Sequence, residues 1–84
     1  MNSKHRKTLF AIFVNPVSRN IEWRRIEALF AAIGCEMIEG RGSRVAFKMH
    51  GLRVDFHRPH PRKEAKPYQV RIAREFLEKM EIKP

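Results

Sequence analysis

The chain has little cysteine, no long hydrophobic run and neither an internal repeat nor a low-complexity tract. Its single cysteine, Cys35, excludes an internal disulfide and any zinc cluster built from thiolates. The N-terminal segment places basic residues before an apolar run, as a signal peptide does. That run is short, lacks a small-residue cleavage site and ends at Asn15-Pro16. We therefore expect a helix of a cytoplasmic protein here.

Acidic residues are also scarce in the middle of the chain. Between Arg41 and Pro67 only Asp55 and Glu64 carry a carboxylate. A nuclease site with two divalent metals needs clustered carboxylates, so we expect neither a metal nor another cofactor.

Basic residues are abundant in that same segment. The chain has a formal net charge of +9, and six of those charges lie between Arg41 and Pro67. This excess predicts a polyanionic partner. A membrane surface is disfavoured because no segment combines an apolar helical face with a lysine-rich one. DNA ranks below RNA because no predicted helix has a basic recognition face.

The chain is long enough for one domain over residues 1–84, and its first third predicts two helices. Ser3 is the expected cap of a first helix, which ends at Asn15-Pro16. Asn20 is the expected cap of the second helix, and Gly34 suits the left-handed position after its last turn. The apolar stripes that should face the core are Leu9, Phe10, Ile12 and Phe13 in the first helix and Trp23, Ile26, Leu29, Phe30 and Ile33 in the second.

Three strands should follow, from Cys35 to Glu39, from Arg44 to His50 and from Leu52 to His57, because apolar and polar residues alternate there. Only His50-Gly51 separates the last two strands, which predicts a two-residue hairpin and so fixes the register. Arg44 should then face His57. Lys48 should face Arg53. Because two like charges repel, this face should be open to water or hold an anionic ligand.

After this hairpin, residues 58–66 predict an irregular basic loop, and Pro67 suits the first turn of a last helix. Val70, Ala73, Phe76, Leu77 and Met80 should point inward from that helix. The order predicts an α+β fold in which helices cover one face of a three-stranded antiparallel sheet and leave the other face free.

The chain resembles the HicA family of bacterial toxins from about Trp23 to Met80. The resemblance rests on the helix that ends in Ile33-Gly34, on the Gly42-Ser43 step into the second strand, and on the motif that leads into the last helix. That motif reads His60-Pro61-x-Lys63-Glu64-x-Lys66-Pro67-x-x-Val70-Arg71. It implies a fold like the double-stranded-RNA-binding domain over residues 20–82, with residues 1–16 as an accessory helix.

The same resemblance implies a function. HicA proteins are endoribonucleases that cleave mRNA without a metal and block translation, and a HicB-type antitoxin covers their active surface. One position departs from the family pattern. Family members commonly carry an essential histidine directly after the Gly-Ser step, where this chain has Arg44. Arginine stays protonated, so Arg44 can bind a phosphate and stabilise charge but cannot take a proton.

His57 is therefore the first candidate for the general base. The predicted register places it across from Arg44, with the two Cβ atoms about 5 Å apart. A neighbouring cation favours the neutral imidazole that a base needs. The alternative is a solvent-exposed strand histidine without a chemical role. His60 is the candidate acid, or else a residue that orders its proline-bound loop, with Glu64 as its partner or as the partner of a lysine.

The other basic residues of this segment are expected to bind RNA phosphates: Arg41, Lys48, Arg53, Arg58, Arg62, Lys63 and Lys66. His50 is expected to serve the hairpin turn. Trp23 is expected in the core rather than stacked on a base, whereas Tyr68 is free to stack at the edge of the site.

Two functions follow from these residues. The first is an endoribonuclease in which the ribose 2′-OH attacks the phosphate, with His57 as base, His60 as acid, and Arg44 or Lys63 as charge stabiliser. The second is a non-catalytic RNA-binding module that keeps the fold but has lost its catalytic histidine to Arg44.

Overall fold

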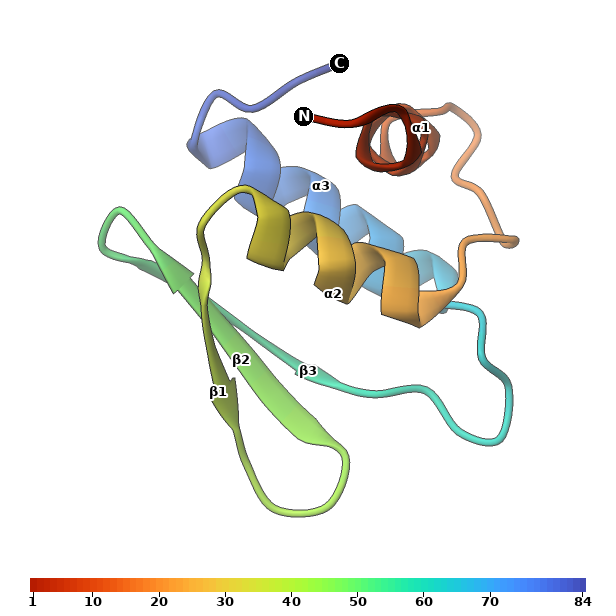
Figure 1. Ribbon diagram of the computed structural model, residues 1–84. Helices are drawn as coiled ribbons and strands as arrows, with labels where there is room; N and C mark the ends of the chain where they lie inside the picture. The colour runs from red at the N-terminus through yellow and green to blue at the C-terminus, as the bar shows by residue number, and fades with distance from the viewer.

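Three helices and three antiparallel strands make up the structure, a computed structural model that describes residues 1–84. In chain order they are α1 (Ser3–Ile12), α2 (Trp23–Ala32), β1 (Glu36–Glu39), β2 (Arg44–Met49), β3 (Leu52–His57) and α3 (Pro67–Lys79). The predicted α+β class is confirmed. Figure 1 shows α2 and α3 over one face of the sheet, with α1 beyond them on the side away from the sheet. No helix covers the other face of the sheet.

The strands are ordered β1-β2-β3, and the β2–β3 hairpin has the predicted register. His50 and Gly51 form its turn, with φ of 53° and 76°. Positive φ at both central residues is the geometry whose twist matches a right-handed strand pair, and histidine is among the few side chains that tolerate it. Arg44 therefore pairs with His57.

The core lies between the sheet and the α2–α3 layer. Phe30 of α2 is fully buried at its centre and packs edge-on against Phe47 of β2 and Phe76 of α3, with ring centroids 4.9 and 5.4 Å away. Trp23 is 5% exposed and packs edge-on against Phe56 of β3 at 4.8 Å. The predicted stripes of α2 and α3 are buried or half-buried, so the 3.6-residue period identified both faces correctly.

The predictions for α1 were partly wrong. Leu9 and Ile12 are buried as expected, but Phe10 is 65% exposed and Thr8 is buried in its place. Residues 8, 9 and 12 share one helical face, and residue 10 points away from it. The cap is also different: the side chain of Asn2, not of Ser3, accepts a hydrogen bond from the His5 N–H at 2.9 Å.

The start of α2 is not capped by Asn20. Glu22 precedes the helix and makes no side-chain cap bond. The backbone N–H of Trp23 instead donates to the carbonyl of Lys63 at 2.8 Å, and the N–H of Ala65 donates to the carbonyl of Ile21 at 2.7 Å. An unpaired N–H at a helix start needs some acceptor. Here the basic loop supplies it, and this pairing holds the loop against the N-terminal end of α2.

Candidate functional site

Arg44 and His57 form a cross-strand pair on the free face of the sheet. Both side chains are exposed, and both project from paired positions of β2 and β3, away from the helices. His57 Nδ1 lies 3.3 Å from the Ser43 hydroxyl, the residue just before β2. The backbone adds a second link, because the Arg58 N–H donates to the Ser43 carbonyl at 2.8 Å. A fixed cation and a titratable ring thus lie side by side on an open surface.

Gln69 fixes the backbone of this pair, and it was missed in the sequence. Its side chain is 1% exposed and joins two segments. The Nε2 group donates to the His57 carbonyl at 2.7 Å, while Oε1 accepts from the Lys66 N–H at 2.9 Å. The last residue of β3 is therefore tied to the start of α3. A glutamine at the third helical position that reaches back to the N-cap N–H is half of a capping box.

A shallow depression of about 140 Å³ lies beside Arg44 on the free face. Its lining includes three arginines, Arg41, Arg44 and Arg53, together with Asp55. Arg53 binds Asp55 through two parallel bonds of 2.9 and 3.0 Å. These bonds, with a smaller effect of Arg44, hold the pKa of Asp55 below its ordinary value. The carboxylate is thus ionised at neutral pH, and two of the three cations have no ion-pair partner.

Lys48 lies on the same face, opposite Arg53 on one side and Glu36 on the other. The register confirms the predicted pairing of Lys48 with Arg53, two like charges that favour open water or an anionic ligand. Asp55 offsets their repulsion, because Arg53 bonds to Asp55 along its own strand. Lys48 remains exposed and without an ion-pair partner.

Arg58 was predicted to bind RNA phosphates, but its guanidinium group is bound to two carboxylates. Its Nε and Nη2 donate to Glu27 of α2 at 2.6 and 3.3 Å, and its Nη1 donates to Glu39 of β1 at 2.8 Å. The Trp23 indole N–H also donates to Glu27. The bonds to Glu27 and then Glu39 raise the pKa of Arg58, and the pKa of Glu39 falls in turn. Arg58 thus joins the end of β3 to α2 and β1.

The basic loop places the remaining candidates around a separate depression of about 310 Å³. His60, Arg62, Lys66 and the unpredicted Arg19 line it. Glu64 also lines it, with its carboxylate 3.8 Å from the Arg62 Nε. No hydrogen bond joins His60 to Glu64, His57 or Arg44. Lys63 is exposed on the same loop. The two candidate histidines therefore lie on adjoining but distinct surfaces.

Three other residues considered from the sequence lie where it predicted them. His50 is in the hairpin turn, Trp23 is in the core and Tyr68 is 51% exposed. Burial raises the pKa of the Cys35 thiol. No group of three or more histidine, cysteine or acidic side chains is arranged to hold a metal ion. None of the three helices is long and apolar enough to cross a membrane.

The amino-acid sequence matches a known protein family. A family model described as "HicA toxin of bacterial toxin-antitoxin" matches residues 23–81. The match begins at the first residue of α2 and ends just after α3, so α1 lies outside it. Neither the curated proteins nor the solved structures contain a significant match.

Proposed function

The chain belongs to the HicA family of toxins of bacterial toxin–antitoxin systems, and we propose that it is an endoribonuclease that cleaves mRNA without a metal. The observation that supports this most directly is the Arg44–His57 pair on the free face of the sheet. The histidine that family members commonly carry after the Gly-Ser step is absent, but an imidazole lies directly across the hairpin from that position.

In the proposed reaction His57 takes the proton of a ribose 2′-OH while that oxygen attacks the adjacent phosphorus. The bond from phosphorus to the 5′ oxygen breaks, and that oxygen receives a proton from a general acid. The products are a 2′,3′-cyclic phosphate and a 5′-hydroxyl end. Arg44 stabilises the extra negative charge of the pentacoordinate phosphorane, as a fixed guanidinium does in phosphoryl-transfer sites. Arg41, beside it, binds the neighbouring phosphate.

Ser43 determines which ring nitrogen of His57 can act as the base. When Nδ1 carries the proton and donates to the Ser43 hydroxyl oxygen, Nε2 is left as the acceptor. When the hydroxyl donates to Nδ1, the proton is on Nε2 and the ring cannot serve as a base on that side. We assign the first arrangement to the active form, with Ser43 as a positioning residue.

The general acid is assigned to His60, and Lys63 is assigned to phosphate binding. The loop that carries both is hydrogen-bonded to the start of α2 and ends at Lys66, which Gln69 joins to β3. These bonds hold the loop beside the sheet edge where His57 lies. For His60 to act as the acid, the RNA strand must run from the sheet toward the loop, with its leaving oxygen on the loop side.

We propose a HicB-type antitoxin as the protein partner, and the cytoplasm as the place where the toxin acts. The exposed cations of the free face, Arg41, Arg44 and Lys48, are suited to acidic side chains as well as to phosphates. An antitoxin bound to this face excludes RNA from His57.

The proposal is tested by comparing His57→Asn with His50→Asn. Both replace an exposed histidine by a side chain that cannot act as a base, and asparagine tolerates the positive φ of residue 50. Purified protein given RNA in EDTA should yield a cyclic phosphate. His57→Asn should lower the rate about 10²- to 10⁴-fold, while His50→Asn should match the wild type. Cleavage that requires a divalent metal, or that survives His57→Asn, contradicts the assignment.

The second candidate function is an RNA-binding module without catalysis. Arg44 at the family's histidine position favours it, because a permanent cation binds phosphate without taking a proton. Such a protein should bind RNA with an affinity that falls steeply with salt, and should leave that RNA intact over hours of incubation.

A further inference from the structure

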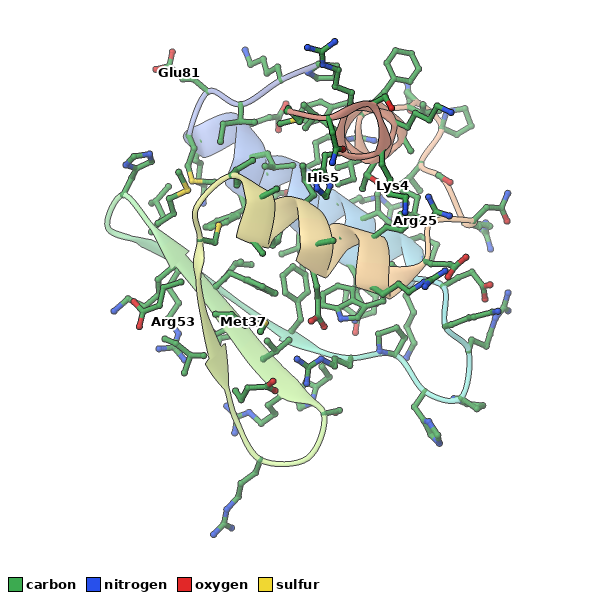
Figure 2. The ribbon with its side chains drawn as sticks, in the orientation of Figure 1. Lys4, His5, Arg25, Met37, Arg53 and Glu81 are labelled. Carbon is green, nitrogen blue, oxygen red and sulfur yellow. The ribbon has the colours of Figure 1, made fainter.

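A second basic surface lies between α1 and α2, on the side of the molecule away from the sheet. Lys4 and His5 of α1 and Arg24 and Arg25 of α2 line a depression of about 170 Å³ there. Figure 2 shows Lys4, His5 and Arg25 gathered between the two helices. We call this depression and the one that adjoins it the α1–α2 groove.

The adjoining depression, of about 350 Å³, extends the groove toward the segment before α2. Lys7 lines it, and Thr8 and Arg25 line both depressions. The only carboxylate on the groove is that of Glu22, which is bound to Arg24 at 2.7 Å. Lys4, Lys7 and Arg25 have no ion-pair partner, so the groove presents three uncompensated cations from two different helices.

This arrangement opposes the stability of both helices. The first turns of α1 and α2 carry basic residues and no acidic ones, although the positive end of a helix dipole favours acidic residues. Folding also brings the cations of α1 against those of α2, and like charges held this close repel. An anion in the groove would relieve both effects.

We propose that the α1–α2 groove binds the phosphodiester backbone of RNA, as a second contact that α1 adds to the HicA core. This inference rests on the proposed RNA substrate. The lining favours a nucleic acid over an acidic protein, because the centres of protein interfaces carry aromatic or large aliphatic anchors. The only apolar residues of the groove are Ala28 in the first depression and Ala11 and Ile21 in the second, and Ile21 is only 5% exposed. Phosphate binding needs charge rather than such anchors.

Figure 1 shows α1 and the sheet on opposite sides of the α2–α3 layer. That layer therefore separates the groove, which α1 and α2 line, from the free face of the sheet. A basic route connects them around the N-terminal end of α2. Arg25 is two residues after Trp23, and the Trp23 N–H donates to the backbone carbonyl of Lys63 in the basic loop. The depression lined by Arg19, Arg62 and Lys66 lies at that loop. One RNA strand can therefore contact the loop and the groove while its scissile phosphate lies at Arg44.

The test compares Lys4→Gln/Lys7→Gln with Lys79→Gln/Lys83→Gln. Each double variant removes two exposed lysines, and Lys79 and Lys83 line neither depression of the groove. Binding is measured by fluorescence anisotropy on a labelled single-stranded RNA whose 2′-O-methyl groups block cleavage. The slope of log K against log salt should become less steep by about 1.4 in the groove variant, since each phosphate contact of a single strand contributes about 0.7. The control should keep the wild-type slope.

Adding Arg25→Gln should make the slope less steep by about 0.7 more. The Tm of each groove variant should equal or exceed that of the wild type, because Lys4 leaves the first turn of α1 and fewer like charges face each other across the groove. Equal slopes for groove variant and control would overturn the inference. So would an unchanged RNA slope combined with weaker binding of a polyglutamate peptide, which assigns the groove to an acidic protein.

Cleavage of unmodified RNA by the same proteins separates this inference from the proposed function. If the wild type binds RNA but does not cleave it, catalysis at His57 is refuted, and the slopes alone still decide the role of the groove. If the wild type does not bind the RNA at all, both the groove and the RNA substrate are refuted.

Discussion

Replacing Glu27 by glutamine removes the charge that binds Arg58 to α2 and keeps the size of the side chain. Glu27 accepts two hydrogen bonds from Arg58 and one from the Trp23 indole. Glutamine retains one acceptor oxygen and adds an NH₂ group that faces the guanidinium. The Glu27→Gln variant therefore tests whether this ion pair holds the end of β3, and with it the backbone next to His57, against the core.

The burial of the two partners sets the expected loss of stability. The Glu27 and Arg58 side chains are 19% and 30% exposed. Breaking a fully buried pair costs about 3–5 kcal/mol, whereas an exposed pair contributes about 0–1 kcal/mol. A mostly buried pair with a second carboxylate, Glu39, still in place lies between these limits. We expect the free energy of unfolding to fall by about 2 kcal/mol, which lowers the Tm of a domain of this size by roughly 10 °C.

Urea unfolding followed by circular dichroism measures this change, with the fluorescence of Trp23 as a second probe of the same site. Glu78→Gln is the matched control, because Glu78 is exposed on α3 and has no ion-pair partner. The control should change stability by no more than about 0.5 kcal/mol. If Glu27→Gln lowers the free energy of unfolding no more than Glu78→Gln does, the ion pairs of Arg58 do not stabilise the fold. Arg58 is then available to bind RNA.

Two further predictions concern the surroundings of His57. Gln69→Ala leaves the His57 carbonyl and the Lys66 N–H without their partner, so the free energy of unfolding should fall by about 3 kcal/mol, and cleavage should slow because the backbone of His57 is released. An unchanged urea midpoint for Gln69→Ala would refute this link. Asp55 has a lowered pKa in the folded state, so its carboxylate stabilises the protein at neutral pH, and this contribution is lost as the pH falls through that depressed value. The urea midpoint of the wild type should therefore exceed that of Asp55→Asn at pH 7. The difference between the two midpoints should shrink as the pH falls below 3.8, the ordinary pKa of this carboxyl, and disappear once Asp55 is protonated in the folded protein. A difference that stays constant at all pH values would contradict this prediction.

The parts of the fold that depend on local spacing could be predicted from the sequence. A two-residue turn leaves one register for the β2–β3 hairpin, so the pairing of Arg44 with His57 followed from counting alone. The stripe of α2 was equally clear, because its apolar residues recur at helical spacing and Gly34 ends the helix. In both cases the deciding residues are neighbours in the chain.

The parts that depend on distant partners could not be predicted in this way. Arg58 was counted as a free cation because its carboxylate partners are 31 and 19 residues away. The start of α2 was assigned to Asn20 because nothing near Trp23 indicates that a carbonyl of the basic loop would accept its N–H. Gln69 is different: Pro67 at the first helical position places it third, where a glutamine typically reaches back to the N-cap. The spacing of Pro67 and Gln69 in the sequence therefore indicates this bond.

The exchange of histidine for Arg44 is compatible with catalysis because of how antiparallel strands pair. Two residues opposite each other project from the same face, with Cβ atoms about 5 Å apart. An imidazole at position 57 can therefore reach nearly the same volume as one at position 44, while Arg44 supplies a cation beside it. Both side chains are exposed, so no buried packing had to change with them. The proposed reaction requires one proton acceptor and one fixed cation on a shared face, and either strand can carry either group.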